Sequence, residues 1–286
     1  MSSKLKTIIP KPFKVFSKKL IQRIIDILVR YNLIKLISAK KIDQLKDSKK
    51  NHHKCFIIGS GPSIGKQNLN LLKNHFTIVH NTFFSVQDNY DFTPNLYVVE
   101  DALVASEFQD QLNLINNTNF VTSHGLKKFI RPKKNVHYIN FDYSYLDSFK
   151  AKNNYENLNF KFSENIKEKA FWGGTVVYLS LQLAYFLGFK EIYLLGVDLS
   201  YTIPKNAKIE GNVITSSENS NNHHGNMYAK GVKWNLPKTD RMKLAIEHAI
   251  KFLSTKNISV YNCSPKSKIE GAENVVYNEL LINNEN

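Results

Sequence analysis

Cysteine is scarce in this sequence, since its 286 residues include only Cys55 and Cys263. Two cysteines so far apart along the chain exclude a disulfide framework and a zinc cluster built on several thiolates. We therefore expect a reduced, intracellular protein. A hydrophobic fraction of 42% excludes a chain that is disordered throughout, because it is enough for a sizeable core.

Long apolar runs are also missing. Residues 1–50 interleave apolar side chains such as Phe13, Ile24 and Leu28 with lysine and arginine, largely at helical spacing. With Asp26 among its interruptions, the segment is too polar to span a bilayer, and it has no small-residue cleavage site of a signal peptide. It predicts a basic amphipathic helix that either lies on anionic lipid or packs on the folded domain.

Negative charge is sparse in the same segment. Residues 1–50 hold 14 lysines and arginines against 3 aspartates, so they supply +11 of the formal net charge of +15 and leave +4 for the rest. A nucleic-acid-binding face is normally spread over the folded domain. We therefore expect no nucleic-acid partner.

The pattern changes after the polar stretch of residues 46–54, so we divide the chain into residues 1–50 and a folded domain of residues 51–286. Short apolar runs then alternate with helical stretches, without an internal repeat. This alternation predicts an α/β fold whose mostly parallel sheet is covered by helices on both faces. The expected strands are Cys55–Ile58, Phe76–Val79, Leu96–Val99, Phe120–Thr122, Val136–Ile139, Glu191–Leu195 and Ser259–Tyr261, and the expected helices are Ser63–Lys73, Ala102–Ile115, Thr175–Leu187, capped by Gly188, and Thr239–Ser254.

Residues 200–237 interrupt the alternation with a long polar segment rich in asparagine, serine and glycine. A structureless loop of this length is usually functional or disordered. We expect a lid-like insertion over an active site, and an ordinary mobile insertion is the alternative.

The turn after the first strand is the first candidate for ligand binding. It lacks the third glycine of a G-x-G-x-x-G fingerprint, since Ile64 stands there, and no G-K-S/T of a Walker loop follows. What remains is a strand, a tight turn of small residues and a helix start, which suits a phosphate or another anion. The turn consists of Gly59, Ser60, Gly61, Pro62 and Ser63.

Polar residues also follow other strands of the predicted sheet. They are His80 and Asn81 after the second strand, Glu100 and Asp101 after the third, and Asp198 and Tyr201 after the strand at residues 191–195. A second glycine turn, Gly173, Gly174 and Thr175, leads into a helix. Each of these alone is also explained as a helix cap or turn. Because open parallel sheets bind ligands at the carboxyl ends of their strands, we expect these residues to converge on one rim.

Three stretches, "FIIGSGPSI", "HN" and "GGTVVYLSLQLAYFLGFKEIYLLGVDLSY", resemble known families. They are similar to the bacterial lipooligosaccharide sialyltransferases of glycosyltransferase family 42. They are equally similar to the related group that contains the flagellin-modifying Maf glycosyltransferases and an archaeal hydroxymethylpterin diphosphokinase. The resemblance covers roughly residues 54–265.

The resemblance implies a single Rossmann-like, glycosyltransferase-A type domain that binds a CMP-activated nonulosonic acid without a metal. It implies that Ser60, Gly61, Pro62, Ser63, Asn81, Gly173, Gly174, Thr175 and Asp198 surround the nucleotide, while tyrosines beyond the aspartate hold the phosphate. The candidates for that role are Tyr201 and Tyr228.

A general base is needed to deprotonate the acceptor hydroxyl, and histidine suits this role because its pKa lies near neutral pH. His223 and His224 in the insertion are the candidates. In the sialyltransferases the base lies only a few residues before the "TD" that opens the next helix. Here Trp234–Pro237 fills that interval, so a surface histidine pair is the alternative.

The chain has no D-x-D pair of carboxylates, which metal-dependent glycosyltransferases usually use to hold a divalent ion. We expect a metal-independent, inverting glycosyltransferase that needs no cofactor besides its CMP-sugar donor. Its expected acceptor is a bacterial surface glycan or glycolipid (lipooligosaccharide, O-antigen or capsule). Its expected place is the cytoplasmic face of the inner membrane, reached through residues 1–50, and homo-oligomerisation is left open.

Two other functions stay open on the sequence. One is diphosphate transfer from ATP, with Mg²⁺ held by Glu100 or Asp101. If it is not a metal ligand, Asp101 is a candidate for binding ribose or acceptor hydroxyls. The other function is a nucleotide-binding scaffold in glycan assembly without catalysis.

Overall fold

The structure is a computed structural model that describes residues 40–50, 52–142, 159–217, 219, 222–225 and 230–282. The amphipathic helix expected within residues 1–50 falls almost entirely outside the described residues. Of that segment, residues 40–43 are α-helical and continue into the 3-10 helix Gln44–Ser48. Ile42 and Leu45 are buried, so this end of the segment packs on the folded domain.

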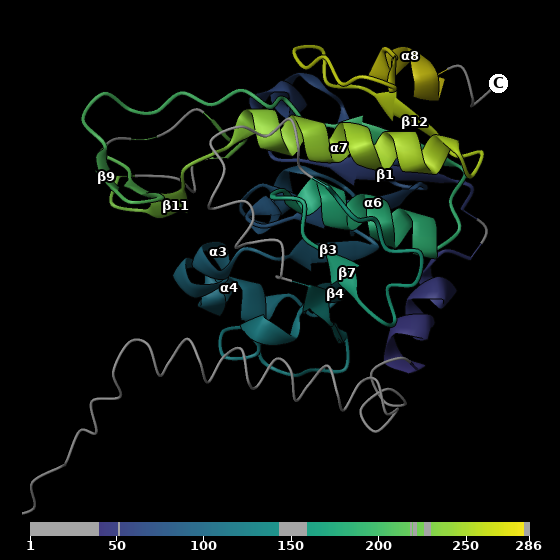
Figure 1. The fold of residues 1–286 in the computed structure, drawn as a ribbon, viewed down its shortest axis with the longest axis horizontal. Coiled ribbons are helices and arrows are strands. Elements are labelled where there is room, and N and C mark those ends of the chain that lie inside the picture. Colours follow the sequence, from purple (N-terminus) through teal and green to yellow (C-terminus); the bar gives the residue numbers. More distant parts are fainter. Residues whose placement is uncertain are drawn as a thin grey trace, which may run out of the picture.

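An eight-stranded sheet forms the centre of the molecule (Figure 1). Its order is β13-β12-β8-β1-β2-β3-β4-β5, and every neighbouring pair is parallel. The strands are β1 (Lys54–Ile58), β2 (Phe76–His80), β3 (Leu96–Val99), β4 (Asn119–Ser123), β5 (Val136–Ile139), β8 (Glu191–Leu195), β12 (Ser259–Asn262) and β13 (Glu273–Asn274). The predicted α/β fold is confirmed, and so are all seven predicted strands.

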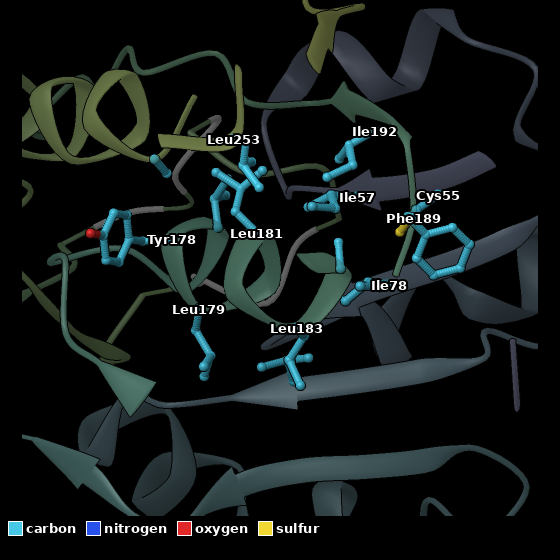
Figure 2. Close-up of a cluster of buried hydrophobic side chains, with 14 of the residues drawn as sticks. Cys55, Ile57, Ile78, Tyr178, Leu179, Leu181, Leu183, Phe189, Ile192 and Leu253 are labelled. Carbon is cyan, nitrogen blue, oxygen red and sulfur yellow. The ribbon is translucent and has the colours of Figure 1, made fainter. Parts of the chain in front are cut away.

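Helices cover both faces of this sheet. On one face lie α6 (Val176–Phe186) and α7 (Thr239–Ser254), and on the other lie α3 (Ala102–Glu107) and α4 (Gln109–Leu114). Alternate residues of the strands other than β13 therefore enter two separate cores, which is why these strands read as continuous apolar runs. Figure 2 shows the first core, where Leu181 of α6 lies beside Leu253 of α7.

Two of the expected helices differ in the structure. The segment expected as the helix Ser63–Lys73 forms two 3-10 helices, Pro62–Lys66 and Leu69–Leu72, because Gln67 between them is extended. The helix expected over Ala102–Ile115 is divided into α3 and α4 at Phe108, whose φ of −117° and ψ of 26° are not helical. Gly188 has the left-handed φ of 79° expected of a cap after α6.

The remaining elements are short. They are the 3-10 helices Phe83–Ser85, Gln87–Asn89 and His124–Leu126, the helix α8 (Tyr277–Ile282), and the strands β6 (Phe141–Asp142) and β7 (Ala170–Phe171), which pair in parallel. Within the part of the chain that the structure describes, no helix has the length and apolar character of a membrane span.

Both cysteines lie in the interior. Cys55 is 0% exposed and Cys263 is 3% exposed, and neither forms a disulfide. Burial raises the pKa of the Cys55 thiol well above its usual value and that of Cys263 to about 12. Both side chains therefore remain protonated thiols at neutral pH.

The sequence suggested a structureless loop for the insertion at residues 200–237. The structure instead has strands there. It contains the antiparallel strands β9 (Lys208–Glu210), β10 (Val213–Thr215) and β11 (Lys233–Asn235). Ile214 and Trp234 form its small core, and the turn between β9 and β10 contains Gly211 at a φ of 62°. Figure 1 shows β9 and β11 projecting from the body of the molecule, with β11 leading into α7.

The strand order determines where a ligand would bind. β1 lies between β2 and β8, and the chain builds the sheet outward from β1 first on one side and then on the other. In open α/β sheets, ligands bind at the carboxyl ends of the strands where the order reverses in this way. Here that position lies at the ends of β1 and β8.

Candidate functional site

The first glycine turn joins the carboxyl ends of β1 and β8. The N–H of Gly59 donates to the carbonyl of Leu195 at 2.8 Å, and that of Gly61 donates to Gly196 at 2.9 Å. A Cβ atom on Gly59 would lie 2.5 Å from the oxygen of Gly196. These glycines therefore let the two strand ends approach each other, a requirement that the sequence alone did not reveal.

Asp198 holds the same turn in place. It is 5% exposed, and its two carboxylate oxygens accept hydrogen bonds from the N–H of Ser63 at 2.8 Å and from the Ser63 hydroxyl at 2.5 Å. A Cβ on Gly61 would lie 2.6 Å from Asp198 Oδ2. The structure thus brings together the predicted residues Gly61, Pro62, Ser63 and Asp198. The carboxylate of Asp198 is hydrogen-bonded to Ser63 of the turn.

His223 of the insertion lies against the first glycine turn. Its Nδ1 is 2.9 Å from the hydroxyl of Ser60, and its ring packs edge-on against Tyr201 with 5.6 Å between the ring centroids. Burial lowers the pKa of His223 to about 4, so the imidazole is neutral at pH 7. Burial and the nearby Asp198 raise the pKa of Tyr201 to about 12, so its phenol keeps the proton that it needs to donate a hydrogen bond.

His224 contacts the turn through its backbone and a different residue through its ring. Its N–H donates to the carbonyl of Ser60 at 2.7 Å, and its Nε2 is 2.8 Å from the hydroxyl of Tyr90. Burial lowers its pKa as well. Tyr90 follows the 3-10 helix Gln87–Asn89 and was not a candidate from the sequence, since nothing local distinguishes it from a core tyrosine.

Asn81 follows β2 in a left-handed conformation with a φ of 49°. Its backbone is fixed, because its N–H donates to Val98 at 3.2 Å and its carbonyl accepts from the hydroxyl of Tyr97 at 2.6 Å. Its side-chain Oδ1 is buried and has no hydrogen-bond partner among the described residues. An oxygen in this state costs stability unless a ligand supplies a donor, so Asn81 remains a candidate ligand contact.

The second glycine turn begins α6. The hydroxyl oxygen of Thr175 accepts a hydrogen bond from the N–H of Val177 at 3.4 Å and caps the helix. Gly173 lies against the ring of Tyr178, where a Cβ would be 2.4 Å from Cγ. Gly174 has a φ of 79° and lies against the side chain of Arg241, which extends from α7. Both glycines thus permit close packing around this turn.

The two carboxylates after β3 differ in their surroundings. Asp101 caps α3 by accepting from Leu103 N at 2.7 Å, and both of its oxygens accept from Asn235 Nδ2, at 2.9 and 2.8 Å. Its carboxylate thus ties β11 of the insertion to α3. Burial and the charge of Asp101 raise the pKa of Glu100 to about 8, although Arg241 acts against this shift.

The insertion therefore crosses the carboxyl edge of the sheet. It meets the end of β1 at Ser60, the region after β2 at Tyr90, and the region after β3 at Asp101. The predicted residues at these strand ends share one edge of the sheet, whereas Tyr228 lies outside the described residues. Where the structure describes the chain, no three histidine, cysteine, aspartate or glutamate side chains are grouped so that they could hold a metal ion.

Comparison with known proteins identifies relatives of this chain. The family model "6-hydroxymethylpterin diphosphokinase MptE-like" matches residues 30–204, which is more than half of the chain. A comparison with curated protein sequences found no match.

Several solved structures are similar to this chain at low sequence identity, among them a glycosyltransferase and a sialyltransferase. The Maf glycosyltransferase from Magnetospirillum magneticum AMB-1 is 17% identical, with a TM-score of 0.45 over 84% of this chain. This chain spans only 39% of that protein's length. The sialyltransferase CstII from Campylobacter jejuni, determined with the substrate analogue cytidine-5'-monophosphate, is 16% identical, with a TM-score of 0.44 over 79% of this chain and 86% of its own.

Proposed function

Since the chain belongs to the MptE-like family of 6-hydroxymethylpterin diphosphokinase-like proteins, we propose that it is a transferase acting on a nucleotide-activated substrate. The substrate would bind at the carboxyl edge of the sheet, where β1 and β8 end and the insertion crosses over them. This is the position that open α/β sheets generally use for ligands.

In its specific form, the proposal is that the enzyme transfers a nonulosonic acid, such as sialic acid or Kdo, from CMP to a bacterial surface glycan. The acceptor hydroxyl would lose its proton to a histidine and attack the anomeric carbon, while CMP leaves with the bonding electrons and the configuration inverts. Tyr201 and Tyr228 would donate hydrogen bonds to the departing phosphate. No metal takes part in this scheme, and no cofactor is needed besides the donor.

One observation carries the proposal, namely the contact of both insertion histidines with Ser60 in the glycine turn. It puts an imidazole that is neutral at pH 7 beside the turn that would hold the donor phosphate, and a neutral imidazole has a lone pair that can accept a proton. Of the two histidines, His223 has its ring against Ser60, whereas the ring of His224 contacts Tyr90 and lies beside Gly65. We therefore assign the base to His223 first and to His224 second.

Diphosphate transfer is the second candidate function, because the family takes its description from a diphosphokinase. It would use ATP with Mg²⁺ held by Glu100 or Asp101. Both oxygens of Asp101 accept hydrogen bonds from Asn235, so a metal at Asp101 would bind a carboxylate that the insertion already holds in place. A scaffold that binds nucleotide without turnover is a third candidate, and it would not need the insertion histidines.

The proposed place of action is the cytoplasmic face of a bacterial inner membrane, where lipid-linked acceptors are assembled. The support is the charge of +11 on residues 1–50 in a segment that also carries apolar residues at helical spacing. Association with a second copy of the chain is left open.

Thermal stability measured with CMP, CDP, UDP, GDP, ADP and ATP, each with Mg²⁺ or with EDTA, tests these alternatives. A ligand that binds only the native state raises the melting temperature. We expect stabilisation by CMP or CDP that persists in EDTA, followed by turnover of a CMP-nonulosonate donor. Stabilisation by ATP alone, and only with Mg²⁺, would reject the glycosyltransferase and favour diphosphate transfer.

A further inference from the structure

The excess positive charge of the folded domain is concentrated in one short segment. Residues 51–286 have a formal net charge of +4, and five of their cations lie within residues 127–134. The surrounding residues 111–141 contain no aspartate or glutamate. Without these five charges the rest of the domain would be slightly negative. The five cations are Lys127, Lys128, Arg131, Lys133 and Lys134.

The segment joins β4 to β5 and packs on the face of the sheet that α4 also covers. Its apolar side chains Leu126 and Ile130 are buried at 3% and 1% exposure. Asn113 of α4 holds its backbone, because the side chain accepts from the N–H of Arg131 at 2.9 Å and donates to the carbonyl of Phe129 at 2.8 Å. Since the backbone is fixed in this way, the charged side chains lie on the outside.

Four of the five cations are exposed, and we call them the basic surface: Lys127, Lys128, Arg131 and Lys134. Within the described residues, none of the four forms an ion pair with a carboxylate. Lys133 differs, because its ammonium donates to the carbonyl of Ile115 at 3.2 Å and to Asn116 Oδ1 at 3.0 Å. The basic surface therefore has charge that the described protein does not neutralise.

The basic surface lies beside the place where the N-terminal segment joins the domain. The ammonium of Lys41 donates to the carbonyl of Lys133 at 2.8 Å, and His137 of β5 donates from Nδ1 to the carbonyl of Lys41 at 2.8 Å. Figure 1 shows α4 and the purple helical segment of residues 40–48 in the lower part of the molecule. Residues 1–39, which precede this junction, hold nine lysines and arginines against one aspartate.

Two basic segments that meet in this way repel each other, and an anionic partner that contacts both removes the repulsion. An exposed apolar side chain indicates which partner this is. Leu114, next to Asn113 at the end of α4, is 75% exposed. Cations combined with exposed apolar side chains are typical of a protein that lies on an anionic lipid surface.

A single-stranded nucleic acid would instead need aromatic rings on which its bases can stack. The rings in this segment are covered. The ammonium of Lys127 lies over the ring of Tyr138, 4.9 Å from its centroid, and that of Lys128 lies over Phe129 at 4.5 Å. Lipid headgroups therefore fit this surface better than bases do.

We propose that the basic surface, together with Leu114, binds the anionic headgroups of a lipid bilayer. This inference rests on the proposed function for its place of action, but it uses none of the residues of the candidate site. The segment starts at the carboxyl end of β4, and the candidate site lies at the same edge of the sheet. Contact with the bilayer here would hold that edge close to lipid-linked acceptors.

Sedimentation of the full-length chain with lipid vesicles tests this proposal. One set of vesicles is phosphatidylcholine alone, and the other also contains the anionic lipid phosphatidylglycerol. The surface variant carries Lys127→Gln, Lys128→Gln, Arg131→Gln and Lys134→Gln. The matched control removes four exposed cations from other parts of the domain, Lys190→Gln, Lys251→Gln, Lys266→Gln and Lys268→Gln.

The wild type should bind the anionic vesicles and not the neutral ones, and added salt should weaken this binding. The surface variant should bind about 10- to 100-fold more weakly, because each cation at an anionic surface contributes about fivefold. The control variant should bind as the wild type does. Leu114→Ser should weaken binding about fivefold without any change of charge, since it removes an apolar side chain. Unchanged melting temperatures show that the variants are folded.

Three results would overturn the proposal: no binding of the wild type to anionic vesicles, wild-type binding by the surface variant, or an equal loss in the control. A DNA duplex that binds more tightly than the vesicles, and is also lost in the surface variant, would overturn it in favour of a nucleic-acid partner.

The melting temperature with CMP in EDTA, measured on the same preparations, separates this inference from the proposed function. Stabilisation by CMP without vesicle binding would reject the lipid surface and leave the proposed transferase standing. Vesicle binding that depends on the basic surface, without stabilisation by any nucleotide, would support the lipid surface and reject the transferase.

Discussion

Ser60 contacts both histidines of the insertion, one through its side chain and one through its backbone. The direction of the hydrogen bond to His223 decides what that imidazole can do. If the ring donates from Nδ1 to the serine oxygen, Nε2 carries a lone pair and can accept a proton from an acceptor hydroxyl. If the serine hydroxyl donates instead, Nε2 carries the proton and cannot act as a base. In the proposed mechanism, Ser60 would therefore position the base.

His223→Ala should lower kcat for transfer from the CMP-sugar donor by about 10²- to 10⁴-fold, the usual contribution of a general base. His224→Ala should have a smaller effect, because its ring contacts Tyr90 and lies beside Gly65 rather than against Ser60. Tyr90→Phe is the matched control, since it removes only the hydroxyl that contacts His224. Wild-type turnover in both histidine variants would show that the base lies elsewhere.

The insertion is the element that joins the separate parts of the candidate site. Its own core consists of little more than Ile214 and Trp234, so it depends on its contacts with the body for its position. The pair of Asn235 with Asp101 is one of these contacts, and because it is exposed, water can replace each of its hydrogen bonds. Breaking and re-forming such a contact therefore changes the free energy of unfolding of the whole domain only slightly.

Asn235→Ala should make residues 200–237 more sensitive to limited proteolysis, because it removes both hydrogen bonds to Asp101 while leaving the core of the domain intact. The melting temperature should remain close to that of the wild type. Lys233→Ala, a change at an exposed position of the same strand, is the control and should be cut at the wild-type rate. Unchanged cleavage in Asn235→Ala would show that this pair does not hold the insertion.

Buried histidines affect the stability of the whole molecule. Burial lowers the pKa of His80 to about 3 and those of His124, His137 and His223 to about 4. In the unfolded chain, histidine titrates near pH 6.5. Between pH 6.5 and about 4, the unfolded state therefore binds more protons than the native state, and the free energy of unfolding falls as the pH falls. Glu100 has a raised pKa, so it makes the free energy of unfolding rise as the pH falls. It is one group, whereas four histidines act in the other direction.

We expect the urea midpoint of unfolding to drop steadily between pH 6.5 and pH 4.5. His124→Asn should show a shallower dependence than the wild type, since one of the four groups is removed. Urea titrations at half-unit steps of pH test this, with the midpoint at pH 7.5 as the reference. A midpoint that does not vary over this range would mean that these histidines do not control acid stability.

The strands of the central sheet could be predicted because burial on both faces requires continuous apolar runs, and these are visible in the sequence. The sheet of the insertion could not, because its strands have three residues each and β9 is exposed along its length. The contacts that build the site could not be predicted from the sequence either. Asp198 meets Ser63 and Asn235 meets Asp101 across more than 130 residues of sequence, and no local pattern encodes such pairs.

The two buried cysteines have a practical consequence for following the insertion in solution. A maleimide dye reacts with thiolates, and neither Cys55 nor Cys263 forms one at neutral pH or reaches the surface. Lys233→Cys would therefore place the single reactive thiol of the chain on β11, without first removing the natural ones. The fluorescence anisotropy of a dye attached there would report how often β11 detaches from the body of the molecule. It would also show whether a bound nucleotide keeps β11 in contact with the body.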